Sequence, residues 1–145
     1  MLLVKTEIII DVPLNLVYAY VADPDNAPEW YENIDSMTWI TDKKVVQGAK
    51  MDFRARFMGR ELAYTYEITQ LIPNEIMVMA TNEGPLAMTT VYEWSKVDEG
   101  RTRFLLINKG EPKGFAKVAK PLMSTMMAKA NKKDLENLKI ILEAV

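Results

Sequence analysis

Apolar and polar residues alternate along much of the chain, in a pattern that predicts one β-strand near the N-terminus and six more in the middle. The first strand is expected over residues 3–11 and stops before Pro13, a residue that suits the first turn of a helix. Period-two alternation begins after Asn33 and predicts strands at residues 34–41, 50–58, 60–72, 75–82, 86–97 and 101–109. Short turn sequences separate these strands, so antiparallel neighbours are expected.

Two short helices are predicted between the first strand and the second. In the first helix the apolar residues recur at helical spacing, at Leu14, Val17, Tyr18 and Val21. In the second, Asp23 is expected to cap the first turn, with Pro24 at the first helical position. Trp30 and Tyr31 lie at the end of this second helix.

A long helix is predicted at the C-terminal end, over residues 113–143. Pro121 lies inside this pattern, so either a kink or a helix start is expected near it. The apolar stripe expected along the helix comprises Phe115, Ala119, Leu122, Met126 and Ala130, continued by Leu135, Leu138, Ile141 and Leu142.

Composition narrows the class of protein. The chain has 145 residues, enough for one domain with a substantial core, and a single domain over residues 1–145 is expected. A net charge of −2 argues against a general nucleic-acid binder, because such domains tend to be strongly basic. The absence of cysteine excludes disulfides and thiolate chemistry. No continuous apolar segment has the length of a signal peptide or a membrane span, and a cytoplasmic location is expected.

The order of these elements indicates the α+β class, with the helices on one side of an antiparallel sheet. Three segments carry a resemblance to a known family: "IIIDVPLNLVYAYVADPDNAPEW", "FMGRELAYTYEI" and "KKDLENLKIILE". The chain resembles the START-like (SRPBCC) superfamily, within it the polyketide cyclase/dehydrase and lipid-transport group. The resemblance implies a helix-grip fold, in which a curved antiparallel sheet of about seven strands wraps around a long C-terminal helix. It also implies a cavity for apolar ligands between sheet and helix.

The hairpin segment "FRARFMGRELAYTYEI" separates aromatic side chains from arginines. Successive side chains of a strand point to opposite faces, so Phe53 and Phe57 are predicted to face the interior while Arg54 and Arg56 face water. A strand that stacked bases and contacted phosphates would need both kinds of side chain on one face. The pattern therefore favours half of a pocket over a nucleic-acid surface. One alternative is that Arg54 or Arg56 turns inward to meet an acidic group of a ligand.

The predicted ligand-binding residues are aromatic residues and methionines from the elements expected to surround the cavity. Methionine suits surfaces that accept varied apolar shapes, although each of these side chains is also an ordinary core residue. The predicted set is Trp30, Phe53, Phe57, Tyr64, Tyr66, Met79, Met88, Tyr92, Phe115, Met123, Met126 and Met127.

Candidate catalytic chemistry is sparse. The chain contains no histidine, which excludes Ser-His-Asp and Cys-His systems and histidine metal sites. Any acid or base must be Asp, Glu, Lys or Tyr with a shifted pKa. The acidic cluster around the second helix, formed by Asp23, Asp25, Glu29 and Glu32, is interpreted as capping. Glu61 and Glu67 share the solvent face of a strand, with the alternative that one of them reaches the cavity. No catalytic residue, metal or cofactor is assigned.

Three functional hypotheses follow. The first is binding or carriage of a small hydrophobic molecule of polyketide, fatty acyl or isoprenoid type. The second is a polyketide cyclase/dehydrase-type enzyme, and the third is a protein-interaction module. Lys113, Lys117 and Lys120 share one side of the long helix and predict either a solvated face or weak contact with a membrane surface.

Overall fold

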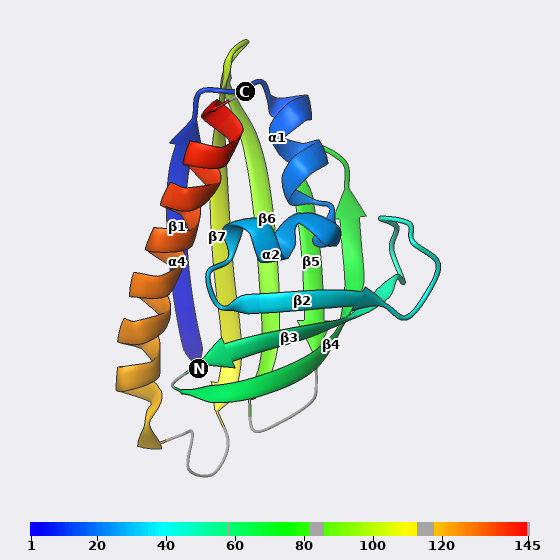
Figure 1. The fold of residues 1–145 in the computed structure, drawn as a ribbon. Coiled ribbons are helices and arrows are strands. Elements are labelled where there is room, and N and C mark those ends of the chain that lie inside the picture. The colour runs from blue at the N-terminus through cyan, green and yellow to red at the C-terminus, as the bar shows by residue number, and fades with distance from the viewer. Residues whose placement is uncertain (58, 82–85, 113–117, 145) are drawn as a thin grey trace.

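The computed structural model describes residues 1–57, 59–81, 86–112 and 118–144 (Figure 1). The strands in these residues form one antiparallel sheet in the order β1-β7-β6-β5-β4-β3-β2. The strands are β1 (Leu2–Ile10), β2 (Ile34–Trp39), β3 (Lys50–Phe57), β4 (Arg60–Ile72), β5 (Ile76–Thr81), β6 (Leu86–Asp98) and β7 (Arg101–Pro112). The α+β class and the seven-stranded antiparallel sheet are confirmed, and only the strand ends differ from prediction, most at β2 and β7.

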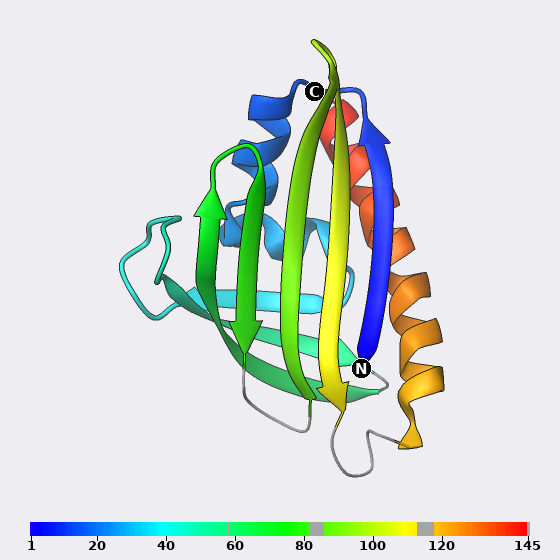
Figure 2. The same cartoon turned by 180° about the vertical axis from the view of Figure 1, so that it is seen from behind.

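The sheet is strongly curved. Its pairing register shifts between Ile34 and Ser36, between Ile68 and Gln70, and between Lys96 and Asp98. Such bulges bend a strand and increase its twist. In Figure 1, β2 and β3 run across the front of the strands that stand upright behind them. Seen from behind, the outer face of the sheet carries no helix from the described part of the chain (Figure 2).

The two helical segments after β1 lie on the inner face of the sheet (Figure 1). Helix α1 (Leu14–Val21) begins directly after Pro13 and buries Val17 and Val21. A short 3₁₀ turn, η1 (Pro24–Asn26), then leads into α2 (Ala27–Trp30). The Asp23 carboxylate accepts the Asp25 amide hydrogen at 3.0 Å, which confirms the predicted cap.

The long helix α4 (Lys120–Glu143) runs beside β1 (Figure 1). Pro121 lies in its first turn, where the missing N–H costs nothing, so the predicted helix start near this proline is confirmed. Residues 113–117, including Phe115, Lys113 and Lys117 of the predicted helix, lie outside the described residues, and Lys120 is half-buried. Among the described residues, no helix is long and apolar enough to cross a membrane.

The predicted buried stripe of α4 is wrong at Leu122 and Met126, whereas Ala119 and Ala130 are partly buried. Leu122 is 55% exposed and Met126 is 37% exposed. The buried positions are Met123, Asn131, Asp134, Leu135 and Leu138. Adjacent apolar pairs at 122–123 and 126–127 are compatible with two stripes. The buried stripe is the one that begins at Met123 and continues through Asn131 and Asp134. A search for apolar residues does not detect it, because two of its members are polar.

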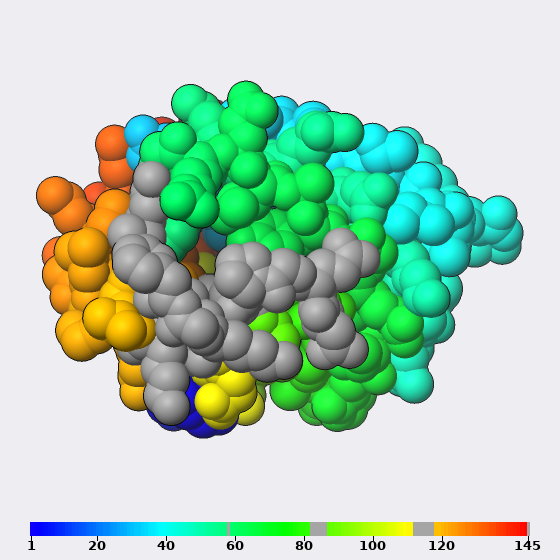
Figure 3. Space-filling model, turned by 90° about the horizontal axis from the view of Figure 1, so that it is seen from below, coloured from blue at the N-terminus to red at the C-terminus, as the bar shows by residue number. Residues whose placement is uncertain are grey.

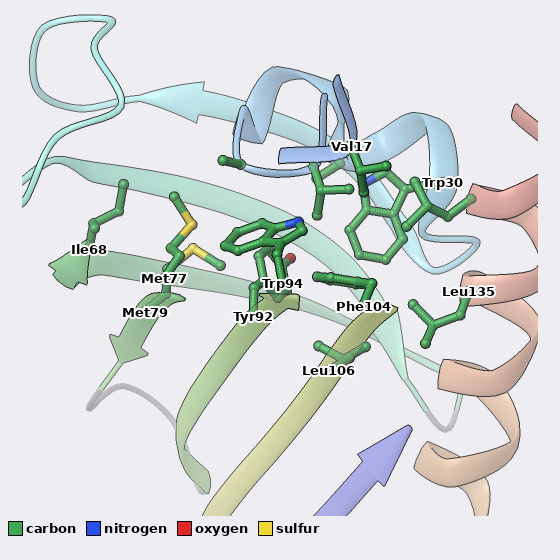
Figure 4. Close-up of a cluster of buried hydrophobic side chains, with 14 of the residues drawn as sticks. Val17, Trp30, Ile68, Met77, Met79, Tyr92, Trp94, Phe104, Leu106 and Leu135 are labelled. Atoms are coloured by element: carbon green, nitrogen blue, oxygen red, sulfur yellow. The ribbon is translucent and has the colours of Figure 1, made fainter. Parts of the chain in front are cut away.

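The core lies between the inner sheet face, α1, α2 and the second half of α4 (Figure 4). Tyr92, Trp94 and Phe104 form its centre, with the Tyr92 and Phe104 ring centroids 5.4 Å apart. Trp30 approaches Phe104 edge-on at 6.3 Å, and Leu135 reaches the same cluster from α4. Met77, Met79 and Thr81 identify the inward face of β5, which the sequence left open.

Candidate ligand-binding cavity

A cavity of about 180 Å³ lies between the β3–β4 hairpin, the inner face of β6 and β7, and the middle of α4. Seen from below, the molecule is hollowed beside the green residues of β3 and β4 (Figure 3). The cavity thus occupies the position between sheet and helix that a helix-grip fold implies. Its walls come from four segments far apart in the chain, so it exists only in the folded protein.

The hairpin supplies a mainly apolar wall formed by Phe53, Ala55, Phe57, Leu62, Tyr64 and Tyr66. Strand alternation places these side chains on one face, because the residues between them point outward. Phe53 is 6% exposed and its ring meets Tyr66 edge-on with centroids 5.7 Å apart. Apart from Arg56 at its edge, this wall consists of aromatic and aliphatic side chains.

Strands β6 and β7 supply a wall that is partly polar. It comprises Met88, Thr90, Tyr92 and Asn108. The Thr90 hydroxyl donates a hydrogen bond to Asn108 Oδ1 at 3.1 Å. Each of these two buried polar groups is thus the hydrogen-bond partner of the other. Burial raises the pKa of Tyr66 to about 12, and a hydrogen bond with Thr90 opposes this rise. Tyr66 is therefore protonated near neutral pH and acts as a neutral hydroxyl.

A tyrosine pair closes another side of the cavity. Tyr31, the residue after α2, has its hydroxyl oxygen 2.7 Å from that of Tyr92 on β6. Burial is the main cause that raises the pKa of each hydroxyl well above its ordinary value of 10.0. Both hydroxyls stay protonated near neutral pH. One of them donates to the other, and the acceptor keeps its own proton for a further partner.

Helix α4 contributes the fourth wall, formed by Met127, Ala130, Asn131 and Asp134. Asp134 is 4% exposed, and its Oδ1 accepts the Glu32 amide hydrogen at 3.0 Å. Burial raises the pKa of this carboxyl to about 6, although the Glu32 amide and Lys133 act in the opposite direction. Asp134 is therefore a buried carboxyl that changes charge close to physiological pH.

Asp134 and Tyr31 also border a surface groove of about 460 Å³ between α2 and α4. Glu29, Glu32 and Lys133 line that groove. The groove is therefore charged, whereas the cavity is mainly apolar. Asp134 and Tyr31 thus lie between the apolar interior and water.

Asn131 is the other polar residue of this wall. It is 6% exposed, and its Nδ2 is buried without a hydrogen-bond partner among the described residues. Sequence reasoning missed Asn131 and Asp134, because it searched α4 for apolar positions. Their spacing could have identified them, because residues four apart lie on the same face of a helix. Asn131 lies four residues after Met127, and Asp134 lies four residues before Leu138.

The structure brings seven of the predicted ligand-binding residues together around the cavity: Phe53, Phe57, Tyr64, Tyr66, Met88, Tyr92 and Met127. Trp30 and Met79 instead belong to the central core. Met123 packs in a smaller cluster with Leu2, Val4 and Met88, and Met126 lies on the exposed side of α4. Phe115 lies outside the described residues. Seven positions therefore remain candidates for ligand contact.

The charged residues singled out in the sequence lie at or beyond the edge of the cavity. Arg54 and Arg56 are exposed, which confirms the predicted strand alternation. Arg56 borders the cavity and pairs with Asp35 at 3.1 Å. Glu61 is exposed, and Glu67 pairs with Lys50 at 3.8 Å on the outer face. No group of acidic residues in the described ranges is arranged to hold a metal ion.

The comparisons with known proteins agree with this geometry. Residues 1–143 match the family described as polyketide cyclase / dehydrase and lipid transport. The chain therefore belongs to this family, which is the group that the sequence resemblance predicted. No curated protein sequence matches the chain.

Solved structures with the same fold are distant in sequence. A protein from Thermus thermophilus superposes with a TM-score of 0.81 at 18% identity, covering 98% of this chain and 97% of that one. The Zhui aromatase/cyclase from a Streptomyces species gives 0.83 at 13% identity, with coverage of 97% and 93%. A START superfamily protein from Mycobacterium smegmatis gives 0.74 at 14% identity, with coverage of 99% and 96%. At these identities the likeness establishes the fold.

Proposed function

We propose that this protein binds or carries a small, mainly apolar molecule in the cavity between the sheet and α4. The observation that carries the proposal is the cavity itself, whose walls are largely aromatic, aliphatic and methionine side chains. Ligand sites of small molecules are typically concave and mainly apolar, with a few polar groups that fix orientation. The family description, which includes lipid transport, supports the same reading.

The size of the cavity narrows the ligand classes. Its volume of about 180 Å³ is close to that of an engineered cavity of about 150 Å³ that binds benzene. A ring-sized molecule, or a ring-sized part of a larger one, matches this space. Among the polyketide, fatty acyl and isoprenoid classes, a compact cyclic polyketide-type ligand therefore fits better than an extended acyl chain.

We also propose that residues 1–145 act as one START-like domain. Support comes from the continuous sheet, which pairs β1 with β7 near the C-terminal end, and from the family match over residues 1–143. A ligand in the cavity would contact segments from both halves of the chain.

Asp134 supports a second candidate function, an enzyme of the cyclase/dehydrase type. A carboxylate with a pKa near 6 can accept a proton from a carbon next to a ketone. The C–H electron pair then moves to the ketone oxygen, which a tyrosine hydroxyl stabilises by donating a hydrogen bond. The pair then returns from the enolate oxygen to form a C=C bond and expels hydroxide from the carbon on the other side of the deprotonated one. The Asp134 carboxylic acid protonates this hydroxide to water and becomes a carboxylate again. Asp134, Tyr31 and Tyr92 line the same cavity, which supports this candidate function.

The proposed binding function is tested by identifying the molecule that the protein carries. Protein purified from its own host is extracted with organic solvent, and the extract is analysed by mass spectrometry against extract from a denatured and washed sample. We expect one apolar or mildly polar cyclic compound in stoichiometric amount. An empty protein that also takes up no aromatic probe at millimolar concentration would contradict the proposal.

A further inference from the structure

Two polar side chains of α4, Asn131 and Asp134, line the cavity side by side. Asn131 is 6% exposed and Asp134 is 4% exposed, and both border the space that the aromatic walls enclose. Residues three apart on a helix lie on the same face, with Cβ atoms about 5–6 Å apart. The two side chains thus form a neighbouring donor and acceptor in a cavity that is otherwise mainly apolar.

Asn131 has hydrogen-bonding capacity that the protein leaves unused. Its Nδ2 is buried and has no partner among the residues that the structure describes. Buried polar groups are nearly always hydrogen-bonded, because an unpaired donor destabilises the folded state. A donor left unpaired at a cavity wall is therefore expected to be satisfied by a molecule inside the cavity.

Asp134 complements this donor. Its carboxylate accepts one backbone amide hydrogen, from Glu32, at 3.0 Å. A carboxylate offers about four acceptor positions, so further capacity remains for a hydroxyl or N–H group. Tyr31 and Tyr92 line the same cavity, and their hydroxyls already share a hydrogen bond with each other. Asn131 therefore offers hydrogen-bond donors, and Asp134 offers an acceptor.

We propose that Asn131 and Asp134 form the polar anchor of the cavity and select ring compounds that carry a hydrogen-bond acceptor and a hydrogen-bond donor on non-adjacent positions. The acceptor, such as a ketone oxygen, accepts a hydrogen bond from the side-chain amide of Asn131. The donor, such as a phenolic hydroxyl, binds the Asp134 carboxylate. Non-adjacent positions keep the two ligand groups free to reach both side chains, whereas groups on adjacent positions would form a hydrogen bond with each other. This inference rests on the proposed binding function and specifies its ligand.

A probe series separates the polar anchor from the cavity. Ethylbenzene has neither polar group, acetophenone has the ketone alone, and 3-hydroxyacetophenone has the ketone and a meta hydroxyl. Affinities are measured by NMR titration at about pH 7.5, where Asp134 is mostly ionised. We expect each added group to tighten binding to the wild-type protein by about tenfold, as hydrogen bonds to buried partners do. This comparison needs no variant, so it does not depend on the folding of one.

Variants assign the two contacts. Asn131→Ala should remove most of the preference for acetophenone over ethylbenzene, and Asp134→Asn most of the preference for the hydroxyl. Lys132→Ala and Glu136→Gln change exposed residues of the same helix and should keep both preferences. Circular dichroism confirms that each variant is folded.

The outcomes distinguish the two claims. Equal binding of all three probes, or preferences that survive both variants, would overturn the polar anchor but leave the cavity a binding site, with water as the partner of Asn131. If no probe binds in the cavity at all, both the proposed function and the anchor fail.

Discussion

The hydroxyl oxygens of Tyr31 and Tyr92 lie 2.7 Å apart, although 61 positions separate the two residues in the chain. The contact joins the segment after α2 to the middle of β6, directly at the wall of the cavity. One of the hydroxyls donates and the other retains its proton. The pair therefore fixes the position of Tyr31 and leaves a donor for a neighbouring group.

Replacing either tyrosine should show that this hydrogen bond couples the two sides of the cavity. Tyr31→Phe and Tyr92→Phe should each lower the free energy of unfolding by about 1–2 kcal/mol, because each leaves the other hydroxyl without its partner. The double variant should cost less than the sum of the single ones. Urea unfolding of the four proteins measures this coupling. Strictly additive costs would show that the two hydroxyls do not stabilise each other.

Asp134 should make the stability depend on pH. Its pKa is about 6 in the folded protein against an ordinary value of 3.8, so the folded state holds the proton more tightly than the unfolded chain. Stability should therefore fall as pH rises from about 4 to above 6, by up to about 3 kcal/mol. Asp134→Asn removes this titration and should be the more stable protein at about pH 8, with the difference vanishing near pH 4.

The control for this experiment is Glu136→Gln, an exposed carboxylate two residues away. It should keep the pH profile of the wild type. Glu32, Lys133, Tyr31 and Tyr92 are the groups that interact with Asp134, and all stay in place in both variants. Parallel pH profiles for wild type and Asp134→Asn in thermal melting would refute the raised pKa.

Substitutions on the two faces of β3 should differ in their effect on the free energy of unfolding. Phe53→Ala removes a side chain that is 6% exposed and should cost about 3 kcal/mol. The neighbouring exposed residue provides the matched change, and Arg54→Glu should stay within about 0.5 kcal/mol of the wild type. Denaturant midpoints measure both. A larger loss from Arg54→Glu than from Phe53→Ala would mean that the strand presents its other face to the interior.

Filling the cavity should block binding without unfolding the protein. Ala130 lines the cavity, so Ala130→Leu should lower the affinity for aromatic probes by at least about tenfold and leave the melting temperature unchanged or higher. Ala128 is exposed on the same helix, and Ala128→Leu should keep full affinity. Probe titration together with thermal melting of both variants makes the comparison. Unchanged affinity in Ala130→Leu would place the probe elsewhere.

The fold was largely predictable from the sequence, because strands such as β3 alternate between apolar and polar residues and most neighbouring strands are close in the chain. The face of β3 that carries Phe53 followed from period two alone, which needs no knowledge of the partner strands. The start of α4 followed from Pro121, since proline is tolerated in a first turn and disrupts a helix interior. The ends of β2 and β7 did not follow, because pairing partners and bulges set them.

The candidate site was less predictable, and Asn131 and Asp134 show why. A search for ligand contacts by apolar character finds Phe53, Met88 and Met127 and passes over polar residues in a helix. The burial of Asn131 and Asp134 depends on the rotation of α4 about its axis. That rotation is decided by packing against β1 and the segment after α2. The raised pKa of Asp134 has the same origin, because burial causes it.

The most direct test of the central claim uses the methionines as reporters. Met88 and Met127 line the cavity, Met77 is buried in the core, and Met126 is exposed on the other side of α4. In a titration with ethylbenzene followed by methyl NMR, we expect saturable shifts at Met88 and Met127, with small changes at Met77 and Met126. Shifts confined to Met126, or the absence of saturable shifts at Met88 and Met127, would contradict a ligand-binding cavity between the sheet and α4.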